Sequence, residues 1–113
     1  SGFGELVDLP NLHTEPSSLV PRHFALYQNY PNPFNPSTTI RFDVPRDSEV
    51  QIRIFNILGQ VVKVLTDKKY KTGQYEIIWQ GTNEQNVPIA SGVYLILMKA
   101  DDFRLVKKTL LLR

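Results

Sequence analysis

Hydrophobic and polar residues alternate with a period of two along most of the chain beyond residue 38. In the first such segment Ile40, Phe42 and Val44 alternate with polar or charged side chains. Such alternation is typical of a β-strand that buries one face. Similar segments follow at residues 50–55, 61–66, 75–80, 93–98 and 103–112. The pattern predicts about seven short strands with frequent turns, as in an all-β sandwich or barrel.

The segments between these strands carry turn signals. Pro45 to Ser48, Asn56 to Gln60 and the lysine-rich stretch Asp67 to Gly73 are expected to be turns. A long loop is expected from Gly81 to Gly92, and a tight turn begins at Asp101. The strand at residues 93–98 is apolar on both sides, which predicts a central position in its sheet. No segment favours a helix.

Aromatic side chains are interpreted from their strand neighbours. Tyr75, Ile77 and Trp79 share one strand face, so we expect Trp79 to pack in the core rather than form an exposed sugar platform. Tyr27, Tyr30 and Phe34 are freer to lie at the surface.

The beginning of the chain differs in composition from the rest. Residues 1–23 contain scattered prolines and polar residues without a period, which predicts a linker or tether before a folded domain at residues 24–113. Residues 29–37 hold three prolines and should form a stiff entry loop that does not pair as a strand. Phe24, Leu26, Tyr30 and Phe34 could anchor this loop on the sandwich.

Composition limits the classes of function. The 113 residues suit one domain with its own core. The net charge of +2 divides into −2 for residues 1–22, with three acids and one arginine, and +4 for the remainder. This bias is too small to indicate nucleic-acid binding. There is no cysteine, and no apolar run has the roughly 18–20 residues of a membrane span. No signal peptide is visible, so an exported protein would carry its signal upstream of this chain.

The sequence offers little catalytic chemistry. His13 and His23 both lie in the predicted tether, and most acids of the domain fall in predicted turns. Neither a Ser/His/Asp set nor calcium-loop spacing nor a glycine-rich phosphate loop is present. We therefore expect a non-catalytic module without a cofactor or a metal.

An ordered set of short motifs gives the chain a family resemblance. The opening stretch from Leu26 to Ile40 reads LYQNYPNPFNPSTTI. Later motifs are Ile54–Gln60, Gly73–Tyr75, Trp79–Asn83, Ala90–Tyr94 and the basic, apolar end Lys107–Arg113. In this order the motifs resemble the type A C-terminal sorting domains of the type IX secretion system, over roughly residues 24–113. Gln80 and Asn86 depart from the family, which often has aspartate and glycine there.

The resemblance implies a fold, a role and partners. Such domains are immunoglobulin-like antiparallel β-sandwiches at the C-terminus of a secreted enzyme or adhesin. After Sec export, an outer-membrane translocon recognises the domain and passes the upstream cargo to the surface or the medium. A sortase-like peptidase then removes the domain and attaches the cargo to lipopolysaccharide. The sequence is also compatible with a weak dimer that forms through the edge strands. The expected recognition residues are Gly92, Tyr94, Lys107, Lys108, Leu110, Leu112 and Arg113.

Two other functions compete with sorting. One is a carbohydrate-binding module of a secreted glycoside hydrolase, which needs an exposed aromatic platform. The other is a structural immunoglobulin-like spacer. Export of a fused reporter would distinguish both from a sorting signal.

Overall fold

The computed structural model describes residues 20–113. Their pattern of alternating residues folds into seven strands, and this part of the chain contains no helix. The strands are β1 (Ala25–Leu26), β2 (Thr38–Val44), β3 (Ser48–Phe55), β4 (Val61–Tyr70), β5 (Gly73–Trp79), β6 (Gly92–Ala100) and β7 (Phe103–Leu111). No membrane-spanning helix occurs among the described residues.

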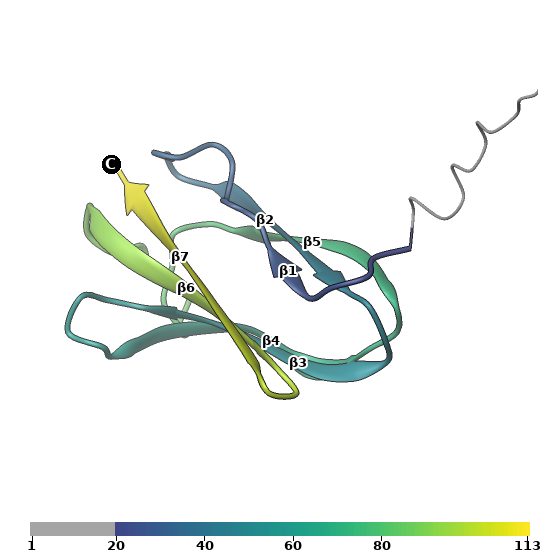
Figure 1. Ribbon diagram of the computed structural model, residues 1–113. Coiled ribbons are helices and arrows are strands. Elements are labelled where there is room, and N and C mark those ends of the chain that lie inside the picture. The colour runs from purple at the N-terminus through teal and green to yellow at the C-terminus, as the bar shows by residue number, and fades with distance from the viewer. Residues whose placement is uncertain (1–19) are drawn as a thin grey trace, which may run out of the picture.

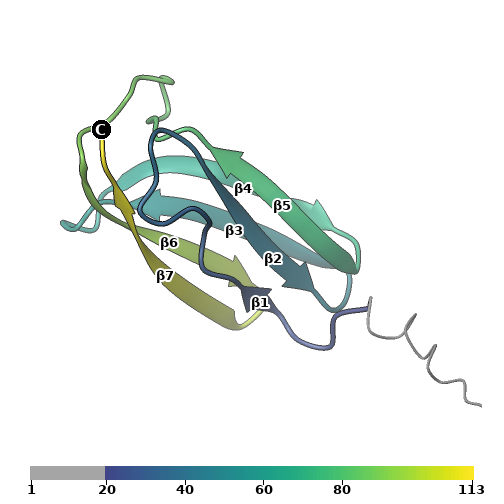
Figure 2. The same ribbon diagram turned by 90° about the horizontal axis from the view of Figure 1, so that it is seen from above.

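The seven strands form two antiparallel sheets packed as a sandwich. One sheet has the order β1-β2-β5 and the other β4-β3-β6-β7. Figure 1 shows the two layers, and Figure 2, seen from above, shows β7 at the margin of the larger sheet. The expected all-β, immunoglobulin-like sandwich is confirmed. The prediction that β6 is an inner strand is also confirmed, since it pairs with both β3 and β7.

The core lies between the sheets and comes from the inward positions of the alternating strands. Trp79 is 1% exposed and its ring lies near those of Phe34 and Tyr94, at centroid distances of 5.3 and 5.8 Å. Its indole Nε1 donates to the carbonyl oxygen of Thr82. The indole therefore has both apolar and polar partners inside the protein, and the predicted core role of Trp79 is confirmed.

The entry segment packs more deeply than its prolines suggest. Phe24 and Leu26 are buried, as expected of anchors, and Phe34 is 1% exposed. The expectation that Phe34 anchors the loop is therefore confirmed, and the other expectation, that it is free to lie at the surface, is wrong. Tyr30 is 80% exposed and does not anchor the loop. The loop also pairs locally, through isolated bridges of Tyr30 to Thr39 and of Phe34 to Leu111.

Strand β4 is longer than its composition predicts. The expected turn at Asp67 to Gly73 is wrong, because the strand continues to Tyr70 and the chain reverses only afterwards. Cross-strand partners explain the extension: Lys69 lies opposite Glu49, and Asp67 accepts a hydrogen bond from Gln51. Opposite charges facing each other stabilise such a pair. A hydrophilic edge strand of this kind is easily mistaken for a turn.

The predicted tether at residues 1–23 and its His13 lie mostly outside the described residues. Residues 20–23 precede β1 without forming a strand.

Candidate functional site

The residues expected to take part in recognition gather around the β6–β7 hairpin. Gly92, the first residue of β6, lies opposite Leu111, and Tyr94 lies opposite Thr109. Leu110, Leu112 and Arg113 continue from this end of the hairpin, so five of the seven expected residues form one cluster. Gly92 has a φ of +156° and a Cβ there would meet nothing within 4 Å. Backbone conformation rather than crowding therefore favours glycine at this strand start.

Tyr94 faces the inside of this cluster. Its side chain is buried beside Trp79, and its hydroxyl donates to the carbonyl oxygen of Ala90 at 2.7 Å. Burial raises the pKa of the Tyr94 phenol, and the positive charge of Arg113 partly offsets that rise. The ring and hydroxyl both contact protein, so Tyr94 fixes the start of β6 against the loop before it.

The two lysines of β7 lie on opposite faces of the sheet. Lys107 pairs with the buried Ile96 and therefore points toward the space between the sheets, where it is half-buried. Lys108 pairs with Leu95 and lies exposed on the outer face. An inward lysine on an edge strand opposes edge-to-edge association, whereas Lys108 is available to a partner.

The end of β7 is hydrogen-bonded along its outer edge by the entry loop. Phe34 donates its N–H to the carbonyl oxygen of Leu110 and accepts the N–H of Leu112, both at 3.0 Å. Figures 1 and 2 show the loop between β1 and β2 beside the C-terminal end of β7. This contact is a short parallel bridge centred on Phe34 and Leu111. The terminal residues are therefore not an open edge.

Polar side chains of the same loop complete this contact. Asn29 is 2% exposed, and its Nδ2 donates to Thr38 Oγ1 at 2.9 Å and to Thr109 Oγ1 at 2.7 Å. Asn32 Oδ1 accepts the N–H of Leu110 at 3.0 Å. The carbonyl oxygen of Lys108 accepts Gln28 Nε2 at 2.8 Å. We call this set the clasp: Gln28, Asn29, Asn32 and Phe34 acting on residues 108–112.

Arg113 attaches the end of the chain to the loop before β6. Its backbone N–H donates to Ser91 Oγ at 2.8 Å, and its guanidinium donates to the carbonyl oxygens of Ile89 and Gly81. Gly81 has a φ of +68°, and a Cβ there would lie 2.9 Å from an Arg113 nitrogen. The positive φ therefore favours glycine at position 81, and a Cβ there would also displace the Arg113 guanidinium.

The sequence patterns identified the terminal residues but not the clasp. The local sequence around Asn29 and Asn32 indicates only a turn-rich loop. Their partners lie about 80 residues away, and a local pattern carries no information on such a contact. A usable signal was the repeated occurrence of asparagine beside the prolines, since amides suit a loop whose backbone cannot form a ladder.

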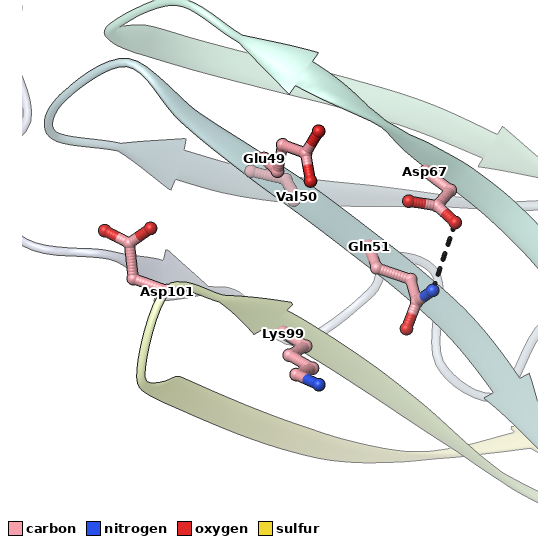
Figure 3. Close-up of a pocket in the computed structure, with 6 residues that line it drawn as sticks. All are labelled: Glu49, Val50, Gln51, Asp67, Lys99 and Asp101. Atoms are coloured by element: carbon pink, nitrogen blue, oxygen red, sulfur yellow. Dashed lines mark hydrogen bonds between the residues drawn. The ribbon is translucent and has the colours of Figure 1, made fainter.

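Two surface hollows lie in the part of the chain that the structure describes, and neither holds a set of converging catalytic groups. One, of about 330 Å³, is lined by Glu49, Asp67, Lys99 and Asp101 among others. Figure 3 shows its carboxylates spread around the rim, with Asp67 turned to Gln51. Asp101 instead pairs with Arg46. Within residues 20–113 no three acids, histidines or cysteines lie together as metal ligands would.

A second hollow, on the smaller sheet, contains a tyrosine–carboxylate contact. The Tyr27 hydroxyl donates to the carboxylate of Asp43, and the Arg41 guanidinium lies 5.2 Å from the Tyr27 ring centroid. The hydrogen bond to Asp43 raises the pKa of Tyr27, and burial and the Asp43 charge add to that rise, while Arg41 opposes it. The contact joins the segment after β1 to β2, which is a structural role.

Comparisons with known proteins agree with the motif order. Among curated proteins none matches the chain. Two solved structures from Porphyromonas gingivalis are similar to it. Dimeric latent PorU is 25% identical with a TM-score of 0.61, over 78% of this chain and 9% of PorU. PorZ, described as an essential surface component of the type IX secretion system, is 19% identical with a TM-score of 0.53, over 79% of this chain and 12% of PorZ.

The two structural matches support different conclusions, because the sequence identity is 25% for PorU and 19% for PorZ. The PorZ match shows the fold alone. The chain spans only about a tenth of the length of either protein. The family comparison is broader, because the model described as the secretion system C-terminal sorting domain matches residues 28–111, from the clasp to the end of β7. The chain belongs to this family of sorting domains, which mark proteins for export to the cell surface or for secretion.

Proposed function

We propose that this domain directs an upstream cargo protein through the outer-membrane type IX translocon, and that it does so without catalysing a reaction itself. The observation that supports this proposal is the clasp, which joins the two most distinctive sequence motifs. The entry loop hydrogen-bonds to Leu110 and Leu112 although about 80 residues separate them. The signal is then a composite surface that exists only in the folded domain.

A composite surface suits a label that is read after folding. Cargo that has crossed the inner membrane can fold before it meets the outer membrane, so a usable signal must remain recognisable in the folded state. The exposed parts here are Lys108, Leu112 and Arg113, held in place by buried Asn29 and Phe34. Fixing these terminal residues before binding removes the entropy cost of ordering them in the complex.

The proposal extends to the steps after export. A sortase-like peptidase cuts in the predicted tether, residues 1–23, and transfers the cargo to a surface lipid. The tether is the chemically reasonable place, because it is rich in proline and polar residues and precedes β1. Termini and loops with small or polar residues are the preferred sites of proteolysis.

A carbohydrate-binding role has less support. Such a module needs aromatic rings exposed on one face, and Trp79 is buried with its indole nitrogen already bonded inside the protein. A mutation at Trp79 would therefore affect stability rather than sugar binding.

The experiment that tests the proposal is export of a folded reporter. A Sec-targeted reporter is fused to the N-terminus of residues 1–113 and produced in a bacterium with a type IX system and in a matched strain without the translocon. We expect the reporter at the surface or in the medium of the first strain only. Removal of Leu112 and Arg113 should leave it in the periplasm. Periplasmic retention of the complete fusion in the competent strain would refute the proposal.

A further inference from the structure

The half of β7 that lies outside the clasp is an open strand edge. In an antiparallel ladder, alternate residues direct their backbone groups to either side. The carbonyl of Lys108, the N–H and carbonyl of Leu110 and the N–H of Leu112 all point away from β6 to the clasp. By the same alternation, Arg104 and Val106 direct their backbone groups outward. Within residues 20–113 these groups have no hydrogen-bond partner.

Strand β1 does not close this edge. It contacts β7 near the turn, where the rings of Phe24 and Phe103 lie 5.1 Å apart, but its ladder partner is β2, so its pairing belongs to the opposite sheet. Figure 2 shows β7 at the margin of its sheet, with β1 in the other layer. The side chain of Val106 is 54% exposed beside the open backbone groups. From Arg104 to Lys108 the edge is about 13 Å long at the usual rise per residue, which is long enough for a short added strand. It meets the clasp at Lys108, whose carbonyl oxygen accepts Gln28 Nε2.

The outer face next to this edge combines apolar and cationic side chains. The ladder places Arg53, Leu97 and Val106 in one row and Phe55, Leu95 and Lys108 in the next. A further row ends with Lys99 and Arg104. No outward position of β6 or β7 carries an acid. A partner that covered this face would therefore gain from apolar side chains flanked by carboxylates.

The same charges disfavour a second copy of the chain as the partner. An antiparallel pairing of two β7 edges centred on Val106 would place Arg104 of one copy opposite Lys108 of the other. Like charges directly opposite each other destabilise a sheet, and the inward Lys107 adds to the repulsion between edges. The edge thus favours a different, acidic strand over a dimer.

The other edge of this sheet is less suitable for strand addition. Strand β4 contains register shifts next to Arg53 and Phe55, and the N–H of Val64 already donates to the Glu84 carboxylate. Bulges of this kind blunt an edge against pairing.

We propose that the Arg104–Lys108 edge of β7 binds an extended segment of a partner protein by strand addition, in which acid, apolar and acid side chains face Arg104, Val106 and Lys108. This inference rests on the proposed sorting function, under which the partner that supplies the added strand is a protein of the secretion machinery. Backbone hydrogen bonds supply the attachment, and the alternating side chains supply the selectivity.

The first test measures peptide binding to the complete chain by NMR. The probe is a short peptide with Glu-Thr-Val-Thr-Glu at its centre, and the control peptide has Lys-Thr-Val-Thr-Lys. We expect the glutamate peptide to shift and protect the amides of Val106 and Lys108. The lysine peptide should bind at least about tenfold more weakly. Equal binding of the two peptides, or none up to millimolar concentration, would overturn the proposal.

Charge reversal provides the matched comparison. The double variant Arg104→Glu and Lys108→Glu should exchange the preference, binding the lysine peptide better than the glutamate peptide. Lys69→Glu reverses a charge on the far edge of the same sheet and should leave the preference unchanged. A short DNA duplex serves as a polyanion probe. If the duplex bound the same amides more tightly than the glutamate peptide did, the partner would be nucleic acid and the strand-addition proposal would fail.

The export assay separates this inference from the proposed function. If the unaltered fusion is not exported, the sorting proposal fails, whatever the peptides do. If the unaltered fusion and the Lys69→Glu fusion are exported but the folded Arg104→Glu/Lys108→Glu fusion is retained, the edge is the docking site. Normal export of the folded double variant would overturn this inference and leave the sorting function standing.

Discussion

Replacing Asn29 with alanine should loosen the end of β7 although no residue of β7 is changed. Asn29 lies in the entry loop, and its buried amide bonds to Thr38 and Thr109, which belong to opposite sheets. The same Nδ2 lies 3.2 Å from the carbonyl oxygen of Pro31. Asn29→Ala removes all of these contacts at once, while the exposed surface of the domain stays nearly unchanged.

The size of the effect follows from the number of contacts and their burial. Each hydrogen bond contributes about 1 kcal/mol net, and buried groups that lose a partner cost more. The hydroxyls of Thr38 and Thr109 retain Pro31 and Asn32 as acceptors, which limits the loss. We expect a decrease of about 2–4 kcal/mol in the free energy of unfolding. For a domain of this size that corresponds to a decrease in Tm of roughly 10–20 °C.

Asn35→Ala is the matched control. Asn35 has the same side chain and lies in the same loop, but it is exposed and has no side-chain hydrogen bond to residues 20–113. Thermal unfolding followed by circular dichroism compares the two variants. Amide hydrogen exchange then locates the effect, which should be largest at Leu110 and Leu112, because both donate to the entry loop.

Two results would refute this reasoning. One is a Tm for Asn29→Ala within about 1 °C of that for Asn35→Ala. The other is a loss of protection spread evenly over β3 and β6, which would make Asn29 a general stability residue rather than part of a clasp.

Three further predictions concern other parts of the fold. Trp79→Ala should destabilise the domain by about 3–5 kcal/mol in urea unfolding, because the buried ring leaves a cavity. Gly81→Ala should lower the free energy of unfolding by about 1–2 kcal/mol, because alanine strains the positive φ and displaces Arg113. Unchanged stability would contradict this prediction. The hydrogen bond to Asp43 raises the pKa of Tyr27 in the folded protein. The stability that this bond contributes is therefore complete below the pKa of Tyr27 in the unfolded chain, which is near 10. It is lost as the pH rises through the pKa of the folded protein. Tyr27→Phe should therefore reduce the loss of stability that occurs as the pH rises above about 10, as measured by urea unfolding.

The sequence predicted those features that depend on neighbours along the chain. Strand periodicity located most strands and the inner position of β6, and it placed Trp79 in the core. Asn86, which stands where the family often has glycine, has a φ of 62°, a left-handed conformation that both residue types tolerate. Each of these conclusions needs only the residues within one strand or turn.

The features that sequence patterns missed depend on contacts between distant segments. Phe34 could be named as an anchor of the loop, but its local pattern does not show that its partners are Trp79 and Leu111. The extension of β4 depends on Glu49 and Gln51 of the neighbouring strand. Likewise, the terminal residues could be identified by resemblance, but their coverage by the entry loop follows only from the three-dimensional fold.

The central claim is that the sorting signal is the terminal strand as held by the entry loop, and reporter export by a clasp-deficient domain tests it most directly. The variant carries Asn29→Ala together with Asn32→Ala, and the Asn35→Ala fusion is its control in the same cells. We predict normal export of the control. We predict periplasmic retention of the double variant at a temperature where circular dichroism shows a folded sandwich and exchange shows exposed amides at Leu110 and Leu112. Export of that double variant at the level of the control would contradict the account.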